Sequence, residues 1–163
     1  MEIERPVDPD IDVHVPGQRD EIRYQHGAVL AVIAVGGVIG AECRYLVSVV
    51  LPHEPTGFPL ATFLINILGC LLIGILMVVI TEFGRGHRLA RPFLGVGVLG
   101  GFTTFSSYAT DVVTLAQHQA AALALAYLVA TPLAAVAAAW LGAAATRWSA
   151  GVLLGGRSRP EES

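Results

Sequence analysis

GGFTTFSSY, residues 100–108, is the stretch that decides how the middle of this chain folds. Two adjacent glycines followed by two β-branched threonines weaken a continuous helix. A break frees backbone carbonyl groups, and within a membrane such groups are tolerated only where protein or a wet cavity surrounds them. Freed carbonyl oxygens suit a hard cation such as sodium. The segment therefore predicts a helix that is broken at mid-membrane depth, provided that the chain spans a membrane.

The composition of the whole chain indicates that it does. Of the 163 residues, 54% are hydrophobic and only 14% are charged, against about 25% charged in an ordinary soluble domain. The net charge is −3 and no basic stripe runs along the chain, so nucleic-acid binding is not expected. We therefore predict an all-α integral membrane protein.

Four apolar runs have about the length of 20 residues that crosses the hydrocarbon core of a bilayer. These predicted transmembrane helices cover residues 27–50, 60–83, 92–116 and 120–147, and the third contains the predicted break. Together they form one four-span domain, 27–148. The acidic, proline-bearing residues 1–26 predict a disordered cytoplasmic tail, and residues 149–163 a polar C-terminal tail.

Arginine placement predicts the orientation. The chain has ten basic residues, and nine of them flank the predicted spans on one side: Arg5, Arg19, Arg23, Arg85, Arg88, Arg91, Arg147, Arg157 and Arg159. The opposite loops carry none. By the positive-inside rule, both termini are cytoplasmic in a multi-pass protein of the cell membrane.

Polar side chains inside the predicted spans are the first candidates for function, because burying them in hydrocarbon is costly. Thr62, Asn66 and Gly69 share one helix face, and the Asn66 carboxamide offers two N–H donors and one carbonyl acceptor. An interhelical hydrogen bond is the alternative role for Asn66. Tyr127 and Thr131 are neighbours at i, i+4, and the following Pro132 requires a neighbour that satisfies the carbonyl it frees.

Aromatic residues follow the predicted break. Phe105 and Tyr108 lie three residues apart on one helix face, while Thr104, Ser107 and Asp111 lie on another. The edge of an aromatic ring carries positive electrostatic potential, so ring edges beside hydroxyl and amide donors suit a small anion. The alternative is an aromatic packing pair with hydroxyls bonded back to their own helix.

Other patterns indicate no chemistry. Residues 95–100 fit GxGxxG, but inside a membrane span they lack the strand and helix of a dinucleotide site. Cys43 and Cys70 lie in apolar runs without metal-ligand spacing, and the five histidines are scattered. Glu42 and Arg44 are close enough to a span end to snorkel to the interface. We do not expect an enzyme, since no nucleophile–base pair is visible.

Three motifs together resemble the Fluc/CrcB fluoride channels. "GGVIGAECRY" (36–45) looks like the family's first-span motif, which ends in the arginine that corresponds to Arg44. "ATFLINILGCLLIG" (61–74) is similar to the second, with Asn66 as the pore asparagine. "GGFTTFSSY" is similar to the family's most distinctive motif, GGFTTFSTF.

The resemblance implies a set of site residues. A structural sodium ion, not transported, would be held by backbone carbonyls of Gly100 and Thr103 from both subunits. Asn66, Phe105, Tyr108 and Thr131 would line the anion pathway, joined by Ser107 or Ser106. Tyr108 replaces the more common phenylalanine, and Asp111 occupies a position usually taken by glutamate.

The implied function is passive export of fluoride, which gives fluoride resistance. The family assembles as antiparallel dimers within membrane lipid. Because the strong arginine bias favours a single orientation, we predict a dimer with an oppositely oriented paralogue. Two alternatives are a small proton-coupled multidrug exporter, for which Glu42 would be the only candidate carboxylate, and a non-transporting assembly subunit.

Overall fold

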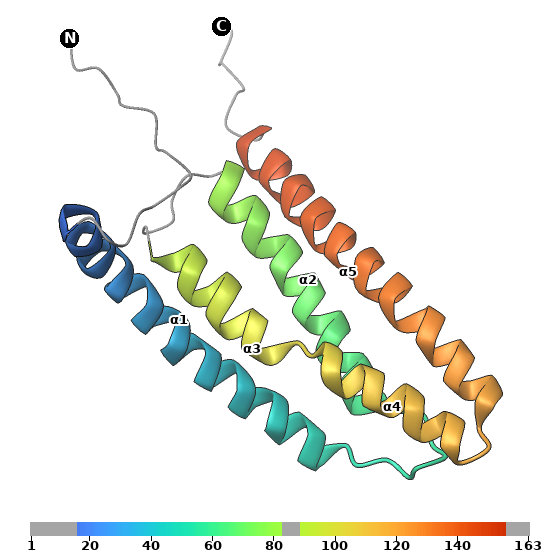
Figure 1. Cartoon of the computed structure of the whole chain (residues 1–163). Helices are drawn as coiled ribbons and strands as arrows, with labels where there is room; N and C mark the ends of the chain where they lie inside the picture. The colour runs from blue at the N-terminus through green and yellow to red at the C-terminus, as the bar shows by residue number, and fades with distance from the viewer. Residues whose placement is uncertain (1–15, 83–88, 156–163) are drawn as a thin grey trace, which may run out of the picture.

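The computed structural model describes residues 16–82 and 89–155, and all regular secondary structure in these ranges is helical. The helices are α1 (Pro16–Val50), α2 (Leu60–Glu82), η1 (Arg91–Leu99), α3 (Gly100–Phe102), α4 (Phe105–Gln117) and α5 (Ala121–Gly155) (Figure 1). Residues 1–15 and 156–163 of the predicted tails, and residues 83–88 between the second and third predicted spans, lie outside the described residues.

Three helices are long and apolar enough to cross a membrane. These candidate spans are Gly27–Val50 in α1, Leu60–Glu82, which is α2, and Ala121–Gly151 in α5. They coincide closely with three of the predicted runs. The remaining predicted run, 92–116, is the third along the chain. It is divided among η1, α3 and α4, which have 9, 3 and 13 residues, so none of these pieces is long enough to span by itself.

Two helices extend beyond the predicted spans. Helix α1 begins at Pro16, so residues 16–26 of the segment predicted as a disordered tail are helical. Proline suits the first position of a helix, because its φ is already helical and its missing N–H would have no partner there. Helix α5 continues to Gly155, past the predicted end at 147 and into the predicted C-terminal tail. The apolar pattern predicts only the lipid-crossing part of each helix.

Glycines set how closely the helices approach. Helix α2 packs along α5, and a Cβ at Gly74 would collide with the Ala139 carbonyl oxygen. Helix α1 packs against η1, where a Cβ at Gly97 would lie 2.9 Å from the Ile33 carbonyl oxygen and one at Gly36 2.6 Å from that of Phe93. Small residues permit such backbone contact in membranes, where no hydrophobic force drives helices together.

The helix beginning with η1 ends at Phe102. Thr103 (φ −72°, ψ 157°) and Thr104 (φ −148°, ψ 125°) are extended, and α4 begins at Phe105. Figure 1 shows the α3 and α4 segments separated at this point. The π-helical geometry of η1 was not predicted from the sequence.

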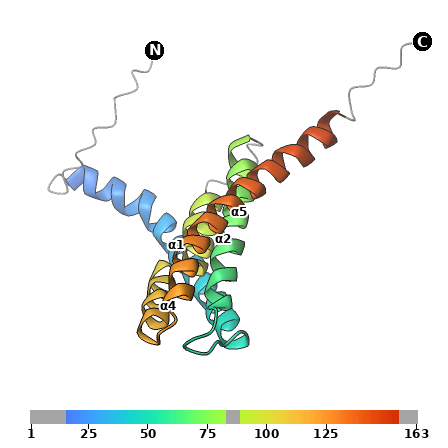
Figure 2. The ribbon, with the colours of Figure 1, turned by 90° about the vertical axis from the view of Figure 1, so that its right-hand side faces the viewer.

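The elements are arranged with their ends on two sides. The start of α1, the end of α2, the start of η1 and the end of α5 lie toward one side, and the 51–59 and 118–120 connections lie at the other (Figure 1). Figure 2 shows the first part of α1 and the last part of α5 diverging from the packed middle. On the first side, Arg147 Nε donates to Glu82 Oε1 at 2.6 Å and joins α5 to α2.

Candidate functional site

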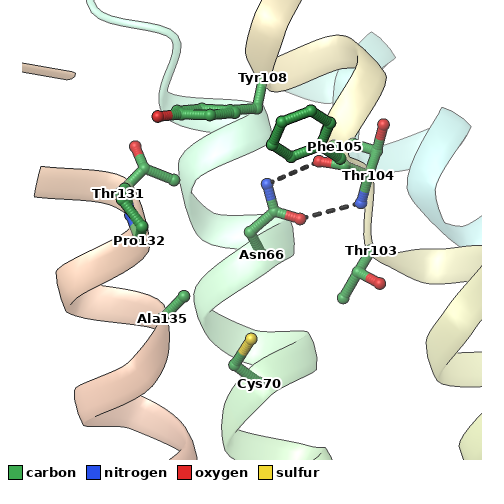
Figure 3. A pocket seen from close by; sticks show the side chains of 9 residues that line it. All are labelled: Asn66, Cys70, Thr103, Thr104, Phe105, Tyr108, Thr131, Pro132 and Ala135. Carbon is green, nitrogen blue, oxygen red and sulfur yellow. Dashed lines mark hydrogen bonds between the residues drawn. The ribbon is translucent and has the colours of Figure 1, made fainter. Parts of the chain in front are cut away.

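A cavity of about 260 Å³ lies against α2, between the extended residues 103–104 on one side and α5 on the other (Figure 3). It is lined by residues of three helices and of the break: Asn66, Cys70, Thr103, Thr104, Phe105, Tyr108, Thr131, Pro132 and Ala135. No charged side chain is among these lining residues. Five residues singled out from the sequence, Asn66, Thr103, Phe105, Tyr108 and Thr131, therefore meet in one place.

The Asn66 side chain forms two hydrogen bonds with the backbone at the break. Its Nδ2 donates to the Thr104 carbonyl at 2.9 Å, and its Oδ1 accepts from the Thr104 backbone N–H at 2.9 Å. In a continuous α-helix that N–H would bond to the carbonyl of Gly100, four residues earlier. The interhelical hydrogen bond considered as the alternative is thus present. An amide nitrogen carries two hydrogens, and the second has no partner among the described residues.

Thr104 begins α4 as its N-cap. Its hydroxyl oxygen accepts from the Ser107 backbone N–H at 3.1 Å and its hydroxyl donates to Ser107 Oγ at 3.1 Å. Threonine at this position satisfies one of the free N–H groups of the first turn. Ser106 Oγ lies 3.3 Å from the same hydroxyl. Neither serine is among the residues that line the cavity, so the structure associates Ser107 with the cap.

The two aromatic residues after the break differ in environment. Phe105 is 79% exposed, whereas Tyr108 is buried. Their ring centroids lie 5.7 Å apart with 53° between the planes, so the rings are not stacked face to face. The Tyr108 hydroxyl donates to the Leu128 carbonyl at 2.6 Å. The Tyr108 hydroxyl is therefore hydrogen-bonded to the backbone of α5, and its ring lies at the cavity wall.

Thr131 supplies a polar atom without a partner. The residue is 3% exposed, and its Oγ1 forms no hydrogen bond with any other described residue. A buried hydroxyl left unsatisfied costs about 1–3 kcal/mol. Thr131 lines the same cavity as Asn66, and its hydroxyl oxygen is buried in the cavity wall (Figure 3).

A second group of polar residues leads from the cavity to the 51–59 loop. The Tyr127 side chain is fully buried, its ring lies 5.4 Å from that of Tyr108, and its hydroxyl donates to Asp111 Oδ2 at 3.5 Å. The other Asp111 oxygen, Oδ1, lies 3.8 Å from His53 Nε2. Helical spacing to Thr131 and Ser107 singles out Tyr127 and Asp111 in the sequence but does not place them in one group. His53 is not singled out, because the loop sequence gives no signal for it.

Other predicted site residues lie elsewhere. Gly100 lines a separate, smaller cavity together with Thr103 and Cys70. Arg44 lies in α1 and is not among the residues of either cavity. No group of three or more metal-binding histidine, cysteine or acidic side chains occurs in the part of the chain that the structure describes.

Comparison with known proteins identifies the family. The profile described as "CrcB-like protein, Camphor Resistance (CrcB)" matches residues 31–143, which include the cavity and both halves of the interrupted helix. The chain belongs to the CrcB family.

Relatives in this family carry the names of ion channels. The chain is 51% identical over 124 residues to "Fluoride-specific ion channel FluC 2" of Nocardia farcinica, covering 76% of this chain and 89% of the relative. It is 55% identical over 119 residues to "Fluoride-specific ion channel FluC 1" of Streptomyces coelicolor, covering 73% and 77%. The predicted resemblance to the CrcB family is confirmed.

Proposed function

We propose that the chain forms a fluoride-selective channel that releases cytoplasmic fluoride passively. The observation that carries this proposal is an uncharged cavity lined both by Asn66, whose second N–H has no partner among the described residues, and by Thr131, whose buried hydroxyl has none. A small anion leaving water must have its hydration shell replaced by such donors. The edge of Phe105 adds positive potential without a fixed charge.

The driving force requires no energy source in the protein. Hydrogen fluoride enters cells as a neutral weak acid and dissociates in the less acidic cytoplasm. A membrane potential that is negative inside then drives the anion outward, by about 2.3 kcal/mol per 100 mV for one charge. A channel is sufficient, which agrees with the names of the relatives.

Liposomes that contain the purified full-length protein together with its second subunit test this function. We expect fluoride efflux, followed with a fluoride electrode, to be fast when valinomycin sets the potential, and chloride efflux to remain at the level of protein-free vesicles. Equal fluoride and chloride fluxes, or none, would contradict the proposal. A non-transporting assembly subunit would give no flux.

The proton-coupled exporter is less well supported. It would need a membrane-embedded carboxylate in its first span, and the only candidate there, Glu42, is exposed on α1 and does not line the cavity. The names of the relatives likewise give no support to it or to an enzyme.

We further propose that η1, α3 and α4 together make one broken crossing, the third of four spans along the chain. The start of η1 and the end of α4 lie on opposite sides in Figure 1, which supports this assignment. Arg91 and Arg147 lie on the side that the positive-inside rule assigns to the cytoplasm. The 51–59 loop then faces the outside of the cell membrane.

A structural sodium ion fits the break. The Thr104 N–H bonds to Asn66, so the Gly100 carbonyl lacks the donor that a continuous helix would provide. We propose that main-chain oxygens of Gly100 and Thr103 hold sodium together with those of a second subunit. The ion would supply positive charge that compensates oxygen atoms without hydrogen-bond donors.

The second subunit is proposed to be an oppositely oriented paralogue, because the arginine bias disfavours inverted insertion of this chain. Expression of this chain alone in fluoride-sensitive cells tests the point. We expect no rescue without the paralogue. Full rescue, with C-terminal tags accessible from both sides of the membrane, would indicate a homodimer instead.

A further inference from the structure

The carboxylate of Asp111 presents a difficulty for an anion pathway. The polar residues that lead away from the cavity run through Tyr127, which lies one helical turn before Thr131, and end at Asp111, whose Oδ2 accepts from the Tyr127 hydroxyl at 3.5 Å. An ionised carboxylate repels a fluoride ion that passes close to it. Even in a water-like dielectric, a unit charge at about 4 Å lowers the local concentration of a like-charged ion about fivefold.

The structure brings one group of possible positive charge to this carboxylate. His53, in the loop between α1 and α2, has its Nε2 3.8 Å from Asp111 Oδ1. The two side chains are 29% and 15% exposed, so the pair is partly shielded from solvent while the imidazole stays in contact with it. The opposite carboxylate oxygen is occupied by the Tyr127 hydroxyl.

We infer that His53 is the counter-charge that allows fluoride to pass Asp111, so that protonation of His53 increases the flux. This inference rests on the proposed function. An imidazole changes its charge between about pH 5 and pH 8. When His53 is protonated, the pair is neutral and the repulsion is removed; when it is neutral, the Asp111 charge faces the anion alone.

The other titratable groups near this pair do not replace His53. Glu54, the next residue in the loop, is exposed and of the wrong sign. His118 at the end of α4 has its Nδ1 2.9 Å from the Thr114 carbonyl rather than at Asp111. Tyr127 contributes a neutral hydroxyl from α5. His53 is therefore the only cationic group that the described residues place against Asp111.

The sign of the effect suits an exporter. Since the 51–59 loop faces outward in the proposed orientation, acid outside the cell protonates His53. The same acid raises the fraction of external hydrogen fluoride that enters the cell. The channel would conduct best when fluoride influx is greatest.

Fluoride efflux from liposomes tests the inference, with the solution on the His53 side varied between about pH 8 and pH 5. Leak of hydrogen fluoride is measured in protein-free vesicles at each pH and subtracted. We expect the flux of the unmodified protein to rise about fivefold as the pH falls. His53→Gln should give low, pH-independent flux, and Asp111→Asn high, pH-independent flux.

Two further variants make the test specific. His118→Gln changes a histidine at the same end of the molecule and should retain the full pH response. The double variant His53→Gln with Asp111→Asn should recover the flux that His53→Gln alone loses, which a folding defect at His53 would not allow. A His53→Gln protein that keeps the pH response overturns the inference. Absence of fluoride-selective flux at every pH would instead overturn the proposed function.

Discussion

The Tyr108 hydroxyl donates a hydrogen bond of 2.6 Å to the carbonyl of Leu128, the residue four positions before Pro132. In a regular α-helix the N–H of residue 132 would bond to this carbonyl, but proline has no N–H. A side chain of α4 thus satisfies the group that Pro132 leaves free in α5. Tyr108, which differs from the phenylalanine that the resemblance implied for this position, thus has a structural partner in this chain.

Tyr108→Phe should therefore lower stability while leaving the cavity wall in place. We expect a loss of about 1–2 kcal/mol in the free energy of unfolding, because the Leu128 carbonyl of an apolar helix is left without a hydrogen-bond donor. Thermal unfolding in detergent measures the effect. In a Pro132→Ala background, where residue 132 has its own N–H, the same substitution should cost much less. An equal loss in both backgrounds would contradict this explanation.

Asn66→Asp should abolish fluoride flux, with a decrease of at least about 100-fold. The substitution places a carboxylate in an uncharged cavity and removes the donor to the Thr104 carbonyl. It keeps an oxygen that can accept from the Thr104 N–H, so assembly should persist. Liposome efflux and size-exclusion chromatography measure the two effects. Normal flux from an assembled Asn66→Asp protein would remove Asn66 from the pathway.

Phe105→Ile should lower fluoride flux about tenfold with little change in stability. The side chain is 79% exposed, so little packing within the chain is lost. Phe105→Trp, which keeps an aromatic edge, should retain most of the flux. Similar fluxes for the isoleucine and tryptophan variants would show that the ring edge is not what fluoride meets.

Cys70 provides a chemical probe of the cavity. Its side chain lines the cavity one helical turn from Asn66, whereas Cys43 is exposed on α1 outside it. In a Cys43→Ala protein, a small thiol-directed reagent should block fluoride efflux. The matched control is a Cys70→Ala protein that retains Cys43, in which the reagent should leave the efflux unchanged. Block in the control alone would place the conducting path elsewhere.

Gly100→Val tests the proposed sodium site. Within the chain, a Cβ at Gly100 meets only the Gly95 carbonyl oxygen, at 3.9 Å, so the fold of the single subunit should survive. We expect loss of the dimer and of sodium-dependent stabilisation, which amounts to about 3 kcal/mol when the sodium concentration is about 100 times Kd. Thr103→Ser, which keeps the main-chain oxygens, should retain both. Unfolding in sodium and in N-methylglucamine measures the difference, and a normal sodium effect in Gly100→Val would reject the site.

The sequence alone determined the features that depend on local composition and spacing. Apolar runs of membrane length predicted α1, α2 and α5, and the glycines and threonines of residues 100–104 predicted where the helix would be interrupted. Asn66 stood out as a polar residue inside an apolar run, and Phe105 stood out as an aromatic residue next to the predicted break. Both signals are visible within a few residues of sequence.

Only the tertiary structure decided which atoms are paired. The Asn66 amide bonds to Thr104, 38 residues away, the Tyr108 hydroxyl to Leu128, and Asp111 lies against His53. The sequence could not distinguish an amide that bonds another helix from one that faces an anion; in the structure one N–H of Asn66 bonds to Thr104 and the other has no partner among the described residues. Helical periodicity specifies the face on which a side chain lies, but its partner depends on how the glycine contacts bring separate helices together.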